Sequence, residues 1–568
     1  MHPKPEPIEY TKKIYKPIIA RAEYWPVMQL SRNRRSFIEE VTEASIERIL
    51  ETKPTRAALI EELETTLHRE KHRIKQNAWA VDPEDDAEFW GEVQKLLVTI
   101  SSDTNGKTTG QEKELLRRIL YRYVEEIAGS FQHNSYRFAR RAITFGFSRL
   151  LNASRVKGFS SLWSNQYSLQ DKLHIAGETD HIRSLAQKGV VVMVPTHFSN
   201  LDSILIGWVI HVLGLPPFIY GAGLNLFNIG VIAYFMNSLG AYKVDRRKKN
   251  VIYLEALKTY SSLAIQKGCH SLFFPGGTRS RSGKIEKRLK LGLLSSAMEA
   301  QREMYQKEQK GGEPARKVFI VPVSLNYNFV LEAPSLINEY LKIKGQERYY
   351  VETDRYSNSY KIMKFLLKFF TRGSDISVSI GRGMDLLGNY VDDEGNSYDN
   401  NGKVIETRDY FVSNGEVTKD KQREQEYTRM LSEAIVLEYH RINRVFPSHL
   451  VAFVAFEMLQ KKYDKLDLFS LLRLSEEELT IPYADFKATF ERMRDVVVRM
   501  YHQNKIHVDP NLMGDVDKVI TYGLKNVGMY HSKRTLMRDK RGDITTEDMN
   551  TLFYYHNRLV GYELEQHI

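Results

Sequence analysis

The sequence predicts an α/β protein with a central, mostly parallel sheet covered by helices and with helical regions at both ends of the chain. Apolar, β-branched runs alternate with helical stretches in the middle of the chain, which is the pattern of strand–helix–strand units. Near the ends, apolar residues recur every three to four positions on charged backgrounds, which indicates amphipathic helices. The predicted strands cover residues 190–194, 217–220, 241–244, 271–274, 318–325 and 376–380.

Four regions are expected along the 568 residues, because a chain of this length exceeds what one core normally serves. We place an N-terminal helical region at 1–155, an α/β domain at 156–390, a polar loop or insertion at 391–418 and a C-terminal helical domain at 419–568. The third region is rich in Gly, Asn and Asp. It lacks the full ligand pattern of a calcium loop, so we interpret it as turns.

The composition describes a globular protein with an excess of positive charge. Lys and Arg number 82 against 71 Asp and Glu, a net charge of +11. That excess predicts an anionic partner: nucleic acid, a membrane surface or a phosphorylated substrate. The single cysteine, Cys269, excludes a disulfide within the chain and fits a reducing, cytoplasmic location. We favour a structural role for Cys269. Thiol catalysis by Cys269 with His270 is the alternative.

No apolar run is long enough to span a membrane, and the N-terminus does not have the pattern of a secretory signal. Residues 203–242 nevertheless contain no Asp, Glu, Lys or Arg. Pro216 and Pro217 divide this segment, so we expect it either to be buried or to lie against lipid. The basic amphipathic stretch at 137–163 is likewise either a packed helix or an interfacial one.

One histidine and one carboxylate follow the strand at 190–194. His197 lies in the predicted turn, and Asp202 begins the next helix five residues later. Such turns open onto the ligand-binding edge of a parallel sheet. A histidine whose second ring nitrogen is held by a carboxylate can act as a general base on a hydroxyl. The alternative is a capping box, since Ser199 and Asp202 also have the spacing for one.

Cationic turns follow two other predicted strands. Arg246 lies two residues after the predicted strand at 241–244. The glycine turn at 274–284, which follows the predicted strand at 271–274, carries Arg279, Arg281 and Lys284. Glycines free backbone amides to approach an anion, and guanidinium groups bind phosphate oxygens in pairs. A solvated loop is the alternative for such a turn taken alone. Pro322 within 318–325 suggests a strand end that faces a pocket.

These motifs, in this order and spacing, resemble the four conserved blocks of the glycerolipid acyltransferases. The blocks are Thr-His197-x-x-x-x-Asp202, Gly240-x-x-x-x-x-Arg246, Phe274-Pro-x-Gly-Thr-Arg-Ser-Arg281 and Val321-Pro-Val. Within that superfamily the chain is most similar to the long, membrane-associated bacterial glycerol-3-phosphate 1-O-acyltransferases. Further similarities are Ala222-Gly-Leu-Asn-Leu226, Asn326-Tyr-x-x-Val330-x-Glu332 and Tyr554-Tyr-His-Asn557. One departure is Gly276, where the third block usually carries glutamate.

The resemblance implies the glycerolipid acyltransferase fold and transfer of a fatty acyl group to the sn-1 hydroxyl of glycerol 3-phosphate, giving lysophosphatidic acid. His197 and Asp202 would be catalytic, and the acceptor phosphate would be bound by Arg246, Arg279, Arg281 and Lys284. The resemblance also implies a pocket wall formed by Thr196, Gly276, Gly277, Thr278, Val321 and Pro322. No metal or cofactor is implied beyond the co-substrate, an acyl-CoA or an acyl carrier protein thioester.

The expected location is the cytoplasmic face of the cell membrane, peripheral or monotopic, on an anionic surface. Dihydroxyacetone phosphate or lysophosphatidic acid are alternative acceptors, since enzymes using them share every block. A non-catalytic membrane-binding or nucleic-acid-binding protein is the alternative of another class. The basic clusters lack interleaved aromatic residues for base stacking, so no nucleic-acid partner is expected.

Overall fold

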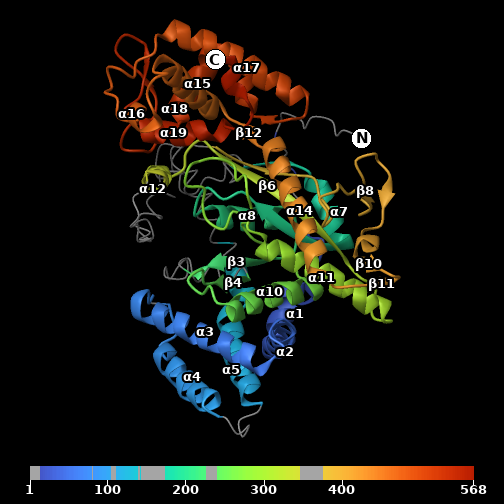
Figure 1. The fold of residues 1–568 in the computed structure, drawn as a ribbon. Coiled ribbons are helices and arrows are strands. Elements are labelled where there is room, and N and C mark those ends of the chain that lie inside the picture. Colours follow the sequence, from blue (N-terminus) through green and yellow to red (C-terminus); the bar gives the residue numbers. More distant parts are fainter. Residues whose placement is uncertain are drawn as a thin grey trace.

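A computed structural model describes residues 15–79, 81–103, 110–138, 173–224, 240–345 and 375–568, together with the single residues 10, 13 and 141. In the described chain a seven-stranded sheet occupies the centre, the N-terminal helices lie on one side of it and the C-terminal helices on the opposite side (Figure 1). The basic stretch predicted at 137–163 falls almost wholly outside the described residues.

The central sheet is mostly parallel, as predicted. Its order is β1-β7-β6-β2-β5-β3-β4, and β6, β2, β5, β3 and β4 all run in one direction. β7 is antiparallel to β6, and β1 is parallel to β7. The strands are β1 (Leu173–Gly177), β2 (Gly189–Pro195), β3 (Ile219–Gly223), β4 (Ala241–Val244), β5 (Ser271–Leu272), β6 (Lys317–Tyr327) and β7 (Ile376–Ile380).

Two strands differ from the prediction in an informative way. β1 was not predicted, because its five residues include His174 and a terminal glycine and form no continuous apolar run. β6 does not end near Pro322 but continues to Tyr327. Pro322 lies where β6 changes partners, since pairing with β2 extends to Val323 and antiparallel pairing with β7 begins there. The expectation of a strand end at this proline is therefore wrong.

Both faces of β2 are covered, which explains its unbroken apolar sequence. Val191 and Met193 belong to the core shared with the helix that follows, whereas Val190, Val192 and Val194 face the core on the opposite side. The helices around the sheet are α7 (Thr179–Lys188), α8 (Asp202–Val212), α10 (Val251–Gln266), α11 (Leu291–Gln309), α12 (Ala333–Lys344) and α14 (Lys421–Arg441).

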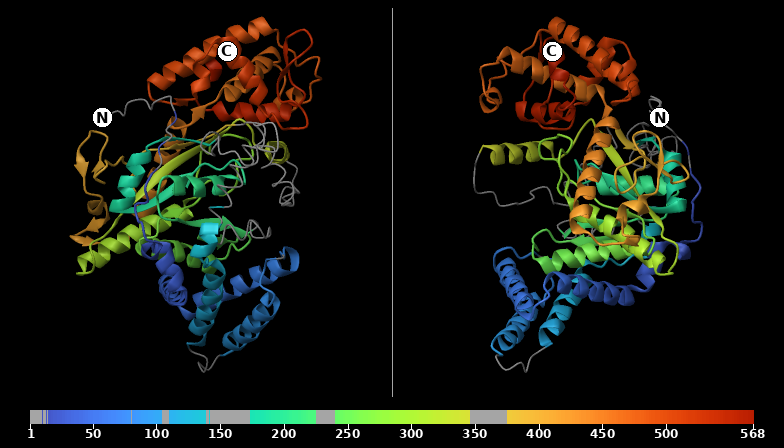
Figure 2. Two further views of the ribbon diagram at one scale, coloured as in Figure 1. Left: turned by 180° about the vertical axis from the view of Figure 1, so that it is seen from behind. Right: turned by 45° about the vertical axis from the view of Figure 1, so that its right-hand side comes forward.

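The N-terminal helices pack against α10 and the β4 edge of the sheet (Figure 2). They are α1 (Pro26–Arg32), α2 (Arg34–Thr52), α3 (Arg56–Gln76), α4 (Asp86–Ser101) and α5 (Gln111–Ile127). Arg247 pairs with Asp82 from this region and with Asp245, and the buried Lys248 pairs with Glu126. These two cations hold the N-terminal helices to the sheet.

The C-terminal helices share one core with the sheet face that carries α8. They are α15 (Pro447–Lys462), α16 (Leu468–Leu471), α17 (Tyr483–His502), α18 (Val516–Asn526) and α19 (Met549–His556), which continues into the 3-10 turn η7 (Asn557–Leu559). Short strand pairs complete this half of the chain: β8 (Ser397–Tyr398) with β9 (Val404–Ile405), β10 (Val412–Ser413) with β11 (Glu416–Val417), β12 (Arg444–Val445) with β13 (His507–Val508), and β14 (Met537–Arg538) with β15 (Ile544–Thr545).

The charge-free segment at 203–242 is a core segment wherever the structure describes it. The side chains that could have faced lipid are buried, with Trp208 7% and Leu213 0% exposed, and only Ile204 is half-buried; the others are Leu205, Leu215 and Phe218. The alternative of burial is thus correct for these residues, and positions 225–239 lie outside the description. None of the described helices is long and apolar enough to cross a membrane.

Candidate active site

The carboxyl ends of the parallel strands bring the predicted site turns to one edge of the sheet. His197 follows β2, Phe274 follows β5, and Arg246 follows β4. β2 and β5 are hydrogen-bonded neighbours, so their turns are adjacent. The backbone amide of Ser280 donates to the carbonyl of His197 at 2.8 Å, and the rings of His197 and Phe274 stack with centroids 4.3 Å apart. The histidine turn and the arginine turn therefore form one unit.

His197 and Asp202 are in contact. Nδ1 of His197 lies 2.7 Å from Oδ2 of Asp202, with the histidine side chain 16% exposed and the aspartate fully buried. A carboxylate only accepts hydrogen bonds, so the proton of the neutral imidazole sits on Nδ1 and the lone pair on Nε2. Nε2 makes no hydrogen bond to any residue that the structure describes. The ring therefore has the tautomer that a general base requires.

Asp202 also organises the turn around the histidine. Its Oδ2 accepts hydrogen bonds from the backbone amides of Phe198, at 2.7 Å, and Ser199, at 3.0 Å. Its Oδ1 accepts one from the hydroxyl of Tyr327 at the end of β6. The capping contacts and the histidine contact are therefore made by the same carboxylate. Tyr327 was not predicted as a site residue, and only its position after the fourth block could have indicated it.

Glu332 connects the histidine turn to the arginine turn. This buried carboxylate accepts from the backbone amide of Asn200 at 2.9 Å and from the Ser199 hydroxyl at 3.2 Å. It also forms an ion pair with Arg279 at 3.4 Å. Arg281 pairs in turn with Glu339 of α12 at 2.7 Å. Both predicted phosphate-binding arginines are thus held beside the histidine turn by carboxylates on the segment after β6.

The other two predicted cations are placed differently. Lys284 is half-buried in the same turn, and its pKa is lowered, first by burial and then by the charges of Lys287 and Lys344. Arg246 is exposed in the loop after β4. Arg279, Arg281 and Lys284 lie together in the glycine turn, and the role of Arg246 in binding phosphate stays a prediction.

The predicted wall residues are found in two places. Thr196 is buried, and its hydroxyl accepts the backbone amide of Leu325 at 3.0 Å, which ties the end of β2 to β6. Val321 and Pro322 are buried within β6. In the glycine turn, Gly277 has a φ of +78°, a conformation that favours glycine. Gly276 does not have a positive φ, so its own backbone conformation does not require glycine.

The side chain that lies against Gly276 is Glu286, a residue the sequence did not mark. A Cβ atom added at Gly276 would lie 2.7 Å from Oε1 of Glu286. Both carboxylate oxygens are buried and have no hydrogen-bond partner among the described residues. Burial raises the pKa of Glu286 to about 7, although its own backbone amide, Arg558 and the backbone of His197 act in the opposite direction.

The C-terminal end of the chain closes over this turn. Nδ2 of Asn557 donates to the carbonyl of Ser282 at 2.8 Å. The guanidinium of Arg558 lies 4.0 Å from the ring centroid of Phe198 and donates to the carbonyl of Leu325 at 2.6 Å. Burial lowers the pKa of Arg558 to about 10. The tail motif that begins at Tyr554 was noted only as a similarity; its contacts place it at the site.

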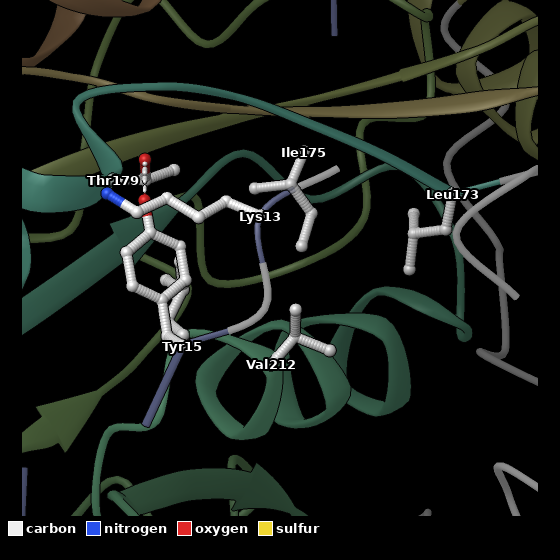
Figure 3. A pocket seen from close by; sticks show the side chains of 7 residues that line it. Lys13, Tyr15, Leu173, Ile175, Thr179 and Val212 are labelled. Atoms are coloured by element: carbon white, nitrogen blue, oxygen red, sulfur yellow. Dashed lines mark hydrogen bonds between the residues drawn. The ribbon is translucent and has the colours of Figure 1, made fainter. Parts of the chain in front are cut away.

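A small pocket lies elsewhere in the molecule (Figure 3). Its lining comes from the N-terminal segment, β1 and the end of α8, and includes Lys13, Tyr15 and Val212 but not His197. Tyr15 is hydrogen-bonded to Thr179 at 2.7 Å, and Lys13 is paired with Asp180 at 2.8 Å. This pocket is therefore separate from the histidine site.

Comparison with known proteins agrees with the geometry. Residues 178–326, which run from the start of α7 to the end of β6, match the model of the family described as Acyltransferase. The segment contains β2, both cationic turns and most of the site residues; Tyr327 and Glu332 follow it directly.

Several relatives are named glycerol-3-phosphate acyltransferase. The chain is 27% identical over 282 residues to that of Actinobacillus pleuropneumoniae serotype 5b (strain L20), covering 49% of this chain and 30% of the relative. It is 27% identical over 275 residues to that of Haemophilus influenzae (strain PittEE), covering 48% and 30%. For the protein of Pseudoalteromonas atlantica the identity is 29% over 229 residues, covering 40% and 24%. The chain thus matches less than a third of the length of each of these relatives.

Proposed function

Because residues 178–326 match the model of the acyltransferase family, we propose that this chain transfers a fatty acyl group from a thioester to a hydroxyl of a phosphorylated glycerol. The observation that carries the proposal is the contact of 2.7 Å between His197 and Asp202, within a turn that is tied through Glu332 to Arg279. A base and an anion-binding group are then held next to each other.

The chemistry needs one base and no covalent enzyme intermediate. Nε2 of His197 takes the proton of the acceptor hydroxyl while the hydroxyl oxygen attacks the thioester carbonyl carbon. The resulting imidazolium is stabilised by the Asp202 carboxylate. When the carbon–sulfur bond breaks, the thiolate leaves and takes that proton from the imidazolium, which gives the ester and the free thiol. Positioned acid–base catalysis of this kind typically contributes about 10²- to 10⁴-fold.

Arg279 and Arg281 would bind the phosphate of the acceptor. Their pairs with Glu332 and Glu339 hold the guanidinium groups in place before a ligand binds, and a positioned guanidinium binds phosphate oxygens in a bidentate manner. Binding the phosphate there would direct the hydroxyl of the same small molecule to His197, which lowers the entropic part of the barrier.

Glycerol 3-phosphate is the acceptor we propose, acylated at its sn-1 hydroxyl by an acyl-CoA or by an acyl carrier protein thioester. The names of the relatives and the cationic turn beside His197 support this choice. An assay that crosses both donors with glycerol 3-phosphate, dihydroxyacetone phosphate and lysophosphatidic acid tests it. Preferred transfer to one of the other acceptors would show that glycerol 3-phosphate is not the substrate. No transfer at all would favour a non-catalytic binding protein.

We also propose that the protein acts on the cytoplasmic surface of the membrane, because its acyl product must enter a bilayer. The net charge of +11 and the exposed residues Lys287 and Arg288 beside the site support an anionic surface as partner. The buried segment of α8 does not contribute to this contact.

A further inference from the structure

The carboxylate of Glu286 is buried at the site and poorly satisfied. Neither oxygen forms a hydrogen bond of good geometry within the described part of the chain, although the backbone amides of Glu286 itself and of His197 lie close enough to lower its pKa. Leaving a buried polar group unsatisfied is costly, so groups of this kind are nearly always bonded in native proteins. A buried acceptor pair beside a proposed substrate site therefore indicates a ligand that brings its own donors.

The position of this carboxylate is defined by its contact with Gly276. A Cβ atom at position 276 would meet Oε1, Cγ and Cδ of Glu286 at 2.7, 3.1 and 3.2 Å. Gly276 is two residues after Phe274, whose ring stacks on His197. The Glu286 carboxylate thus lies against the glycine turn and interacts with the backbone of His197, the proposed base.

The surrounding charges do not satisfy Glu286. The guanidinium of Arg558, the Asp202 carboxylate and the Tyr439 hydroxyl all interact with it electrostatically. Arg558 directs its hydrogen bonds to the carbonyl of Leu325 and the side chain of Asn326 instead, each at 2.6 Å. Nη1 of Arg558 is itself buried without a partner among the described residues.

We infer that Glu286 is a positioning residue that accepts a hydrogen bond from a second, unreacting hydroxyl of the acceptor. The inference rests on the proposed function and specifies the acceptor as a phosphorylated polyol with at least two free hydroxyls. One hydroxyl is acylated at His197, and its neighbour is held by Glu286 while the phosphate is bound by the arginines. Glycerol 3-phosphate has two hydroxyls, whereas dihydroxyacetone phosphate and lysophosphatidic acid have one each.

Acceptor selectivity tests this role, because a purely structural glutamate would affect all acceptors equally. Glu286→Ala should lower kcat/KM for glycerol 3-phosphate by about tenfold or more, the effect of losing a hydrogen bond to a charged group. The value for dihydroxyacetone phosphate and the KM for the thioester should change by less than about threefold, since neither has the second hydroxyl. Glu313→Ala, at an exposed glutamate after α11, is the matched control.

Moving the carboxylate across the turn gives a second test. Gly276→Glu alone should impair activity, because two side chains then compete for one space. Combined with Glu286→Ala, the same change should restore much of the selectivity for glycerol 3-phosphate. If Glu286→Ala does not fold, Glu286→Gln, of the same size, replaces it and should shift selectivity in the same direction.

The outcomes separate this inference from the proposed function. A wild-type protein that transfers to no acceptor overturns both. If the wild-type protein does transfer, three results overturn only the role of Glu286. These are equal losses on both acceptors in Glu286→Ala, no loss in that variant, and no recovery in the double variant. Selective loss with recovery supports it.

Discussion

One buried carboxylate, Asp202, serves the histidine, two backbone amides and Tyr327 at the same time. The chain therefore uses a single group to shape the turn and to orient the base. At the scale of residues, this shared use predicts which variants should lose only activity and which should also lose stability.

His197→Ala should reduce acyl transfer by about 10²-fold or more, since general-base catalysis contributes at least that much. It should leave the thermal midpoint nearly unchanged, because the Asp202 contacts to the backbone of the turn remain. Asp202→Asn should reduce transfer and also lower the midpoint, because the amide group cannot accept all the donors around it. Initial rates and thermal melts check both. Substantial turnover by His197→Ala would disprove the assignment of the base.

Tyr327→Phe removes the donor to Oδ1 of Asp202. Burial, and then the Asp202 charge, raise the pKa of Tyr327 well above its ordinary value, so the hydroxyl remains a donor at all working pH values. This hydroxyl is the only donor to Oδ1 among the described residues, whereas Oδ2 keeps two backbone donors when His197 is replaced. Its loss should therefore cost about 1–3 kcal/mol of unfolding free energy. Urea unfolding measures the cost. An unchanged free energy would show that Oδ1 does not depend on Tyr327.

Glu286 should make stability depend on pH. Its pKa is raised by burial from 4.5 to about 7, so the folded state binds the proton more tightly than the unfolded chain. The free energy of unfolding of the wild-type protein therefore falls as the pH rises from 4.5 through 7. Glu286→Gln lacks this penalty, so the variant should gain up to about 3 kcal/mol relative to wild type between pH 5 and pH 8. Urea unfolding of both proteins at these pH values measures it; a difference that does not vary with pH contradicts the raised pKa.

At the scale of elements, the contact between the arginine turn and α19 depends on Gly283. Its φ is +82°, and a Cβ atom there would lie 2.2 Å from the backbone carbonyl oxygen of Tyr554. The turn and the end of α19 can approach this closely only if no side chain stands between them. The C-terminal helices thereby support the proposed phosphate-binding loop.

Gly283→Ala should therefore destabilise the protein by more than the cost of placing alanine at a positive φ. It should also raise the KM for the acceptor. Gly311→Ala is the control, because Gly311 has a φ of +84° with no atom within 4 Å of an added Cβ. The control should lose about 1 kcal/mol of stability and keep its kinetics. Equal behaviour of the two variants, in melts and in acceptor titrations, would exclude a supporting role for α19.

At the scale of the whole molecule, positive charge and apolar sequence have separate roles. Trp208 of α8 is buried, so Trp208→Glu would disturb the core and cannot report on lipid contact. Part of the charge excess is used internally, as in the pairs of Arg247 and Lys248 with the N-terminal helices. Membrane binding should therefore depend on exposed cations near the site.

Sedimentation with anionic vesicles tests this expectation. The wild-type protein should bind and should dissociate as salt is raised. Reversing the charges of Lys287 and Arg288 to Glu should weaken binding at least tenfold, at about 1 kcal/mol per basic residue near the surface. Reversing Lys540 and Arg541, exposed in the C-terminal region, changes the net charge equally and should have less effect. Equal effects would indicate attraction by net charge alone, and no binding would exclude a surface location of this kind.

The sequence by itself determined the local features. Apolar runs of strand length predicted six of the seven sheet strands, because a strand covered on both faces needs continuous apolar residues. The five-residue separation of His197 and Asp202 already indicated their contact, since a turn joins them directly. The cationic glycine turn was visible for the same reason. The limits of the four regions remain a prediction.

Only the tertiary structure decided which distant residues join the site. Tyr327, Glu332, Glu286 and Arg558 reach it through strand pairing and helix packing, and no local pattern encodes those distances. Burial was also decided there: the charge-free segment suited a core or a lipid surface equally well, and in its described part the neighbours in the fold cover it. The surroundings of Gly276 could not be known from the sequence, because the Glu286 side chain that a Cβ atom there would crowd comes from ten positions away and meets it only in the folded chain.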